Sequence, residues 1–180
     1  MKKIPNILSI ARLILIPLIA WLIIVNLFTY AFFVALIIAI TDILDGFLAR
    51  LLKAESKIGS YLDAIADKAF IISIYMLIGA QNLLPVYIII IVISRDIIIL
   101  GSFALSFMIN QRLEIKTLKI SKINTFFQFV LLFLVLVRNI EIFESSILLE
   151  NLTNIIIFIV IITTISSLLL YIKQWLNTYD

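Results

Sequence analysis

The amino-acid sequence predicts an all-α integral membrane protein with six transmembrane helices in a single domain, residues 1–180. Hydrophobic residues make up 64% of the chain, charged residues make up 14%, and the mean hydropathy is +1.24. These values are far from those of soluble domains. The apolar residues also fall into runs long enough to cross a bilayer, separated by short segments that carry most of the charge. No internal repeat, linker or low-complexity tail interrupts this pattern.

Each expected helix is an apolar run bounded by polar residues. Asn6 is expected to cap the first helix, whose apolar run is longer than that of a signal peptide and lacks a small-residue cleavage site. Pro17 predicts a kink within it. A basic connector, 111–122, precedes the fifth helix, and an acidic loop, 138–150, follows it. The expected helices span roughly residues 7–28, 30–52, 58–80, 86–109, 123–137 and 152–175.

Lysine and arginine residues gather in alternate loops of this arrangement. Eleven fall on one side, Arg138 alone falls on the other, and Lys68 and Arg95 fall within helices. Because basic loops stay on the cytoplasmic side, we predict a multi-pass protein of a bacterial-type cell membrane. Both termini, and the ends of the second and third helices that face each other across their loop, are then cytoplasmic. The eleven residues are Lys2, Lys3, Arg12, Arg50, Lys53, Lys57, Arg112, Lys116, Lys119, Lys122 and Lys173.

Cysteine and histidine are absent from the sequence. Their absence excludes disulfides, thiolate nucleophiles, imidazole bases and zinc sites of the Cys/His kind. The net charge of +3 comes from basic clusters between apolar runs, which indicates anionic lipid as a partner and no nucleic acid. Acid–base or metal chemistry in this chain must therefore use carboxylates.

Four aspartates lie in or next to apolar helices, where a carboxylate is energetically unfavourable and normally functional. Asp42 and Asp45 are three residues apart, Asp63 and Asp67 are four apart, and each pair therefore shares one helix face. The short loop between the two helices makes them antiparallel, so the pairs can converge near the cytoplasmic side. Four converging negative charges repel one another unless cations lie between them, and oxygen ligands select Mg²⁺, Mn²⁺ or Ca²⁺.

Small and basic residues accompany the aspartates. Gly46 and Gly59 lie within the predicted helices, where glycine costs about 1 kcal/mol relative to alanine and is best explained by close approach to the backbone. Arg50 supplies a forked donor set suited to phosphate oxygens. Together these residues predict a diphosphate site. The alternative is that the aspartates form loop-edge salt bridges with nearby lysines and arginines and that the glycines only permit helix packing.

The complete pattern resembles the signature of the CDP-alcohol phosphotransferase (CDP-alcohol phosphatidyltransferase) family. Eight residues match it at fixed spacing, and the resemblance extends from Ile4-Pro5-Asn6 to the last helix. The matching residues are Asp42, Asp45, Gly46, Ala49, Arg50, Gly59, Asp63 and Asp67.

The resemblance implies a role for each of these residues. The four aspartates would hold one or two Mg²⁺ or Mn²⁺ ions, with Asp67 also acting as the general base. The CDP moiety of CDP-diacylglycerol would lie among Gly46, Ala49, Arg50 and Gly59. An acceptor hydroxyl would attack the phosphorus on the lipid side, and CMP would leave, as is typical of catalysis by positioning and charge neutralisation. The resemblance also implies a homodimer.

The acceptor must be inferred from residues outside the signature. Arg95-Asp96, together with the Ser-Lys-Ile-Asn-Thr segment from Ser121 and Gln128, is similar to the CMP-forming cardiolipin synthases, whose acceptor is phosphatidylglycerol. Phosphatidylglycerophosphate synthases, whose acceptor is glycerol-3-phosphate, share part of this element. In either case the candidates for binding the acceptor's phosphate are Arg95, Arg112, Lys119 and Lys122.

Alternatives remain open at this stage. Arg95 can instead form a structural pair with Asp96 or with a carboxylate on another helix, and the basic connector can rest on anionic lipid. Thr125 and Gln128 can be polar contacts between helices. For the whole chain, the alternative classes are an ion or proton transporter, which predicts inverted repeats and broken helices, and a non-catalytic membrane scaffold. The transporter pattern is not seen, and a scaffold leaves the spacing of the aspartates unexplained.

Overall fold

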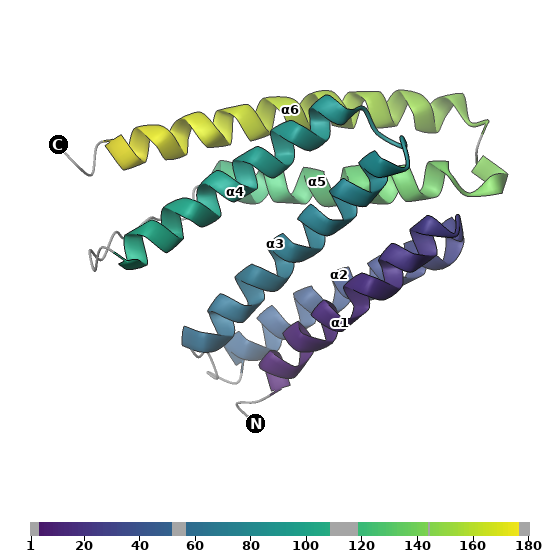
Figure 1. Ribbon diagram of the computed structural model, residues 1–180. Helices are drawn as coiled ribbons and strands as arrows, with labels where there is room; N and C mark the ends of the chain where they lie inside the picture. Colours follow the sequence, from purple (N-terminus) through teal and green to yellow (C-terminus); the bar gives the residue numbers. More distant parts are fainter. Residues whose placement is uncertain (1–3, 52–56, 109–118, 144, 177–180) are drawn as a thin grey trace. The chain divides into compact units, whose positions relative to one another are not determined.

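The computed structural model consists of six α-helices and one 3₁₀ helix, with no strand among the residues that it describes (Figure 1). The described residues are 4–51, 57–108, 119–143 and 145–176. Side chains are described at residue 11 and over 14–41, 68–101, 119–143 and 145–174. The predicted all-α class is therefore confirmed. The helices are α1 (Ile4–Ile24), α2 (Phe28–Leu51), α3 (Lys57–Ala80), α4 (Val86–Met108), α5 (Lys119–Arg138), η1 (Glu141–Phe143) and α6 (Ile147–Leu176).

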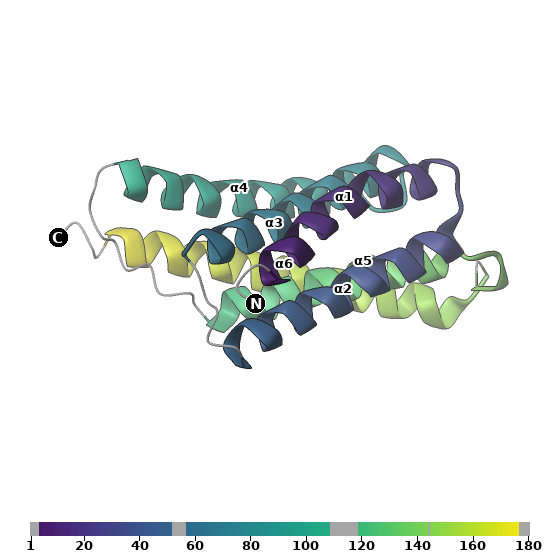
Figure 2. The same ribbon diagram turned by 90° about the horizontal axis from the view of Figure 1, so that it is seen from below.

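The chain divides into two compact units. Unit 1 comprises Met1–Leu83 and Leu136–Glu144, and unit 2 comprises Leu84–Val135 and Ser145–Asp180. Within unit 1, α1 packs against both α2 and α3. Within unit 2, α4 packs against α6, and these two helices run in the same direction while α5 runs in the opposite one (Figures 1 and 2). The single domain predicted over residues 1–180 stays a prediction.

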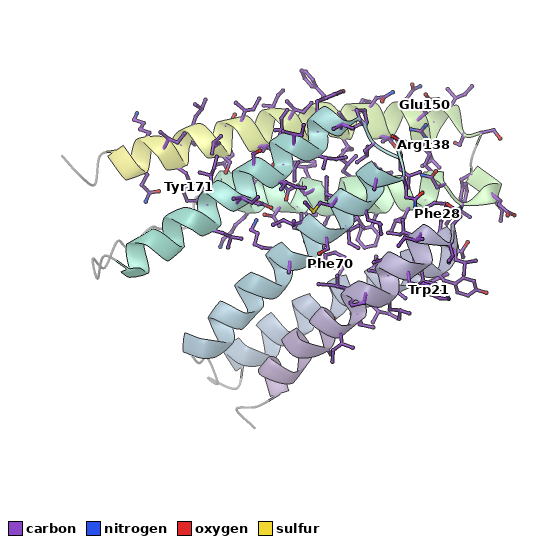
Figure 3. All side chains as sticks on the ribbon, in the orientation of Figure 1. Trp21, Phe28, Phe70, Arg138, Glu150 and Tyr171 are labelled. Carbon is purple, nitrogen blue, oxygen red and sulfur yellow. The ribbon has the colours of Figure 1, made fainter. Side chains whose placement is uncertain are left out.

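Two asparagines in the left-handed backbone region end α1 and α3. Asn26 has a φ of 59°, and the amide of Leu27 donates to the carbonyl of Leu22 at 2.9 Å. Asn82 has a φ of 57° and follows Ala80, the last residue of α3, with the same hydrogen-bond pattern around it. This pattern is the Schellman motif, in which a left-handed residue turns the chain and satisfies the last helical carbonyls. Trp21 and Phe28 lie on either side of the first turn (Figure 3).

Three predicted helix ends are wrong. Asn6 lies inside α1, which begins at Ile4, so Asn6 does not cap the helix. The fifth helix begins at Lys119, so Lys119 and Lys122 belong to its first turn and not to the connector. The sixth begins at Ile147 because Ser146 caps it: its hydroxyl accepts a hydrogen bond from the Leu149 amide at 3.4 Å. The acidic loop is correspondingly shorter than expected.

Two of the described helices are long and apolar enough to cross a membrane, Lys119–Arg138 and Ile147–Gln174, with shorter apolar segments at Ile14–Ile24, Phe28–Thr41 and Lys68–Ala80. A stripe of α6 exposes large apolar side chains at three- and four-residue spacing, among them Ile155, Phe158, Ile162, Ile165 and Leu169. Such a stripe is typical of a helix that faces lipid. Six membrane spans and a cytoplasmic active site stay predictions.

Candidate active site

The four aspartates lie on two successive helices, as the sequence predicted. Asp42 and Asp45 fall in α2 and Asp63 and Asp67 in α3, and the backbone is helical at all four positions. Gly46, Ala49 and Arg50 lie in α2 and Gly59 lies in α3. The side chains at these eight positions lie outside the described part of the structure. The structure places these eight residues along each helix, and the helical backbone determines which of them share a face.

The buried face of α2 leads directly to the first aspartate pair. Phe28, Ala31, Ala35 and Ile38 are buried, at steps of three and four residues along the helix. Continuing these steps beyond Ile38 reaches 42, 45 and 49, so the two aspartates and Ala49 occupy the face of α2 that is buried further back along the helix. Thr41, next to Asp42, donates its hydroxyl to the carbonyls of Ile37 at 2.9 Å and Ile38 at 2.8 Å.

The same relationship holds in α3. Phe70, Ile71, Ile74 and Ile78 are almost fully buried and form the inner face of this helix. Asp67 precedes Phe70 by three residues and Ile71 by four, and Asp63 precedes Asp67 by four. Both aspartates therefore continue the inner face of α3 towards its first turn.

The ends of the two helices are constrained to be close. Leu51 ends α2 and Lys57 begins α3, so five residues join them and span at most about 20 Å. Helix α1 packs against both helices of this pair. The residue types also fit the metal that the family resemblance implies, because four carboxylates supply the hard oxygen ligands that Mg²⁺ and Mn²⁺ prefer.

A second polar group lies in unit 2, around Arg95 of α4. This side chain is 1% exposed, and Nη1 donates to Oδ1 of Asp96 at 2.5 Å. Nη2 donates to the hydroxyl of Ser121 on α5 and, at 2.8 Å, to that of Ser167 on α6. The structural pair between Arg95 and Asp96, one of the two roles considered for Arg95, is thus present, and the guanidinium also joins three helices.

Asn124 forms a further polar layer one turn along α5. Its side chain is fully buried, and Oδ1 accepts hydrogen bonds from Thr164 at 2.8 Å and Thr163 at 2.9 Å, both on α6. Gln128, the next residue on this face, is also fully buried. The hydroxyl of Thr125 donates to the backbone of its own helix, to the carbonyl of Ser121 at 3.1 Å. A seam of polar contacts thus joins α5 to α6.

The remaining acceptor candidates differ in how much the structure says of them. Lys119 and Lys122 are exposed in the first turn of α5. Arg112, like Lys116, lies outside the described residues. Sequence reasoning did not single out Ser167, Thr163 or Thr164. A signal for them is present, since the run Thr-Thr-Ile-Ser-Ser at 163–167 interrupts an otherwise apolar helix and repeats hydroxyl groups at three- and four-residue spacing.

The fold and site define a class: a strongly apolar protein, helical throughout its described elements, in which two successive helices each carry a pair of aspartates in register with residues that are buried further along the helix. The CDP-alcohol phosphatidyltransferase family matches residues 2–172, nearly the whole chain, so this chain belongs to that family. Its members are membrane-associated transferases of phospholipid synthesis. Membership of an enzyme family favours the enzyme hypothesis over the transporter and the scaffold.

Curated relatives carry two different names. The chain is 38% identical to a cardiolipin synthase (CMP-forming) of Rattus norvegicus over 100 residues, which cover 55% of this chain and 33% of that protein. It is 31% identical to a CDP-diacylglycerol–glycerol-3-phosphate 3-phosphatidyltransferase of Aquifex aeolicus over 179 residues, which cover 97% of this chain and 93% of that protein. The similarity to the rat protein and to its human counterpart spans about one third of each relative's length.

Proposed function

We propose that the protein is a phosphatidyltransferase that moves the phosphatidyl group of CDP-diacylglycerol onto the hydroxyl of an acceptor and releases CMP. The observation that carries this proposal is the pair of aspartates on each of two successive helices, at the spacing of the family's signature and in register with their buried faces. Salt bridges at the edge of a loop have no reason to follow such a register.

The roles that we propose for the residues are those that the family resemblance implies, and they agree with the chemistry of phosphoryl transfer. The hydroxyl oxygen of the acceptor forms a bond to the phosphorus on the lipid side, and the bond from that phosphorus to the oxygen of CMP breaks. Asp67 accepts the proton that the hydroxyl loses. Arg50 supplies positive charge for the diphosphate, and Gly46, Ala49 and Gly59 allow the nucleotide to approach the helices closely.

A divalent cation completes this assignment. Asp42, Asp45, Asp63 and Asp67 would hold Mg²⁺ or Mn²⁺, which when bound neutralises negative charge on the phosphate oxygens. One of these carboxylates, Asp67, would serve both as a ligand and as the proton acceptor.

We favour phosphatidylglycerol as the acceptor, which makes the product cardiolipin. Arg95-Asp96 and the segment from Ser121 to Gln128 resemble the cardiolipin synthases, and the similarity to the rat and human proteins of that name supports the choice. The second candidate is glycerol-3-phosphate, which is supported by the Aquifex aeolicus relative that matches 97% of the chain. Both acceptors carry a phosphate.

The start of α5 is suited to binding that phosphate. Lys119 and Lys122 are exposed in its first turn, which contains no acidic residue. The free amides and the positive dipole end of a helix favour an anion at this position. Arg112 of the connector is a third candidate. Arg95, the fourth residue that the sequence singles out, lies next to this turn through its hydrogen bond to Ser121, the neighbour of Lys122.

An acceptor panel tests the function directly. The purified protein in nanodiscs is given labelled CDP-diacylglycerol and Mg²⁺ or Mn²⁺, with phosphatidylglycerol, glycerol-3-phosphate, inositol phosphate or serine. We expect CMP and cardiolipin with phosphatidylglycerol. Phosphatidylglycerophosphate as the main product would select the second candidate, and no CMP with any acceptor would refute the proposal. The particle mass in the same nanodiscs tests the homodimer that we propose from the family resemblance.

A further inference from the structure

We propose that Arg95 is a positioning residue for the acceptor and that Ser121 and Ser167 act with it. In this role the guanidinium does not bind the acceptor's phosphate. It fixes the first turns of α5, and with them Lys119 and Lys122, in the place where they bind that phosphate. The inference rests on the proposed function and adds Ser167, on α6, to the residues that determine how well the acceptor binds.

The hydrogen bonds of Arg95 argue against direct binding of phosphate. A guanidinium grips a phosphate or carboxylate with two parallel N–H groups, using either Nη1 with Nη2 or Nε with Nη2. Nη2 belongs to both pairs, and its two hydrogens are donated to Ser121 and Ser167. Neither pair is therefore available to a phosphate while both serine contacts are present. The side chain is also 1% exposed within the described structure.

The first turn of α5 is destabilised by its own charges and is held from outside its helix. Two lysines occupy it, no acidic residue does, and cations are unfavourable at the positive end of a helix dipole by about 0.3–1 kcal/mol each. Ser121 lies between Lys119 and Lys122 in sequence and receives the hydrogen bond from Arg95 of α4. Through Ser167 the same guanidinium nitrogen holds α6.

The second polar layer supports the same role. One turn along α5, Asn124 accepts hydrogen bonds from Thr163 and Thr164, which lie about one turn before Ser167 on α6. From the first layer to the second, the contact residues move forward along α5, from Ser121 to Asn124, and backward along α6, from Ser167 to Thr164. This order is the one expected for antiparallel helices. Arg95 ends this series at the lysine-bearing end of α5, where its loss displaces the two lysines most.

Serine substitutions separate positioning from direct binding. If Arg95 bound the phosphate, removing a serine hydroxyl would free Nη2, and the KM for the acceptor would stay the same or fall. If Arg95 positions α5, removing either hydroxyl weakens the anchor, and the KM for the acceptor rises. The KM for CDP-diacylglycerol is unchanged in the positioning case, because the residues proposed for the nucleotide are on other helices.

The experiment compares Ser121→Ala, Ser167→Ala and Arg95→Lys with Ser166→Ala, a matched control whose side chain makes no hydrogen bond to Arg95 in the described structure. We expect the first three variants to raise the acceptor KM about 5- to 20-fold, because the lost hydrogen bond to a charged group acts on the acceptor only through the position of α5 and only part of its free energy reaches the KM. Ser166→Ala stays within about twofold. Ser167→Thr keeps the hydroxyl, so its acceptor KM should lie close to that of the wild type. The double variant Ser167→Ala with Arg95→Lys should have about the same acceptor KM as Arg95→Lys alone. An acceptor KM that is unchanged or lower in both serine variants would overturn the inference.

Hydrogen exchange tests the positioning role of Arg95 without any enzymatic turnover, so its result does not depend on the proposed function. Amide hydrogen exchange is measured over residues 119–125 of the full-length protein in nanodiscs. We expect exchange in this segment to be about tenfold faster in Ser167→Ala than in the wild type or Ser166→Ala, because the segment opens more often without its anchor. Equal protection in all three proteins would overturn the positioning role, whichever acceptor, or none, supports CMP release.

Discussion

Asn124 of α5 accepts a hydrogen bond from the hydroxyl of Thr164 of α6 at 2.8 Å, and both side chains are almost completely buried. Thr163 lies beside Thr164 and donates to the same oxygen at 2.9 Å. The two threonines differ in their other possible hydrogen bonds. The hydroxyl of Thr163 also lies 2.8 Å from the carbonyl of Ile159, so it has another acceptor in its own helix.

This difference predicts unequal effects of removing the two hydroxyls. Thr164→Val should lower the free energy of unfolding by about 1 kcal/mol, the usual size for a buried hydrogen bond between membrane helices. Thr163→Val should lower it by less than half of that, because Asn124 keeps its contact with Thr164. Thermal unfolding in one detergent, followed by circular dichroism, measures both. An equal loss in the two variants would show that Asn124 does not favour Thr164.

The turns at Asn26 and Asn82 give a second prediction, for the backbone. Both residues have a positive φ, a region that glycine adopts freely and alanine does not. We expect Asn26→Ala and Asn82→Ala each to lower the free energy of unfolding by about 1 kcal/mol, while the glycine variants stay within about 0.5 kcal/mol of the wild type. Asn154→Ala, at an exposed position inside α6, is the control. Alanine variants as stable as the glycine variants would contradict the assigned turns.

Lys122 gives a prediction for the acceptor. The residue is exposed in the first turn of α5, and Lys173 is exposed in the last turn of α6. Lys122→Gln should raise the KM for a phosphate-bearing acceptor about tenfold, as expected for losing a charge-assisted contact. Lys173→Gln should leave it within about twofold. If the two variants have the same effect, the lysines act through general attraction to anionic lipid and form no acceptor site.

The helices could be predicted from the sequence because each is a long apolar run, but their ends could not be predicted as well. Lys119 and Lys122 continue the charge pattern of the connector, which predicts a loop, whereas the helix includes both in its first turn. Glu150 continues the acidic pattern of the preceding loop, which predicts a start of α6 near Leu152, whereas Ser146 caps the helix and α6 begins at Ile147. Asparagine often caps a helix, so Asn6 predicts a helix start at that residue. The helix begins at Ile4 instead, and Asn6 therefore lies inside α1.

For the candidate site as well, features that depend on one helix could be predicted from the sequence, and contacts between helices could not. The spacing of Asp42, Asp45, Asp63 and Asp67 predicted two helix faces, because spacing within one helix depends only on its local geometry. The pair of Arg95 with Asp96 is only one of the roles that the sequence leaves open for Arg95, because neighbouring residues on a helix do not face each other by geometry alone. The contact of Arg95 with Ser167 spans 72 residues and depends on how α4 and α6 pack, which local patterns do not determine.

The central claim is that Asp67 takes the acceptor's proton in a metal-dependent transfer from CDP-diacylglycerol. The most direct measurement is CMP release by the full-length protein in nanodiscs, with Mg²⁺ or Mn²⁺ and phosphatidylglycerol, comparing the wild type, Asp67→Asn and the exposed control Glu150→Gln. We predict turnover in the wild type and the control that EDTA abolishes and added metal restores. Asp67→Asn should keep its circular dichroism and lose at least about 100-fold in rate. Full activity in Asp67→Asn, or in the wild type with EDTA, would contradict the claim.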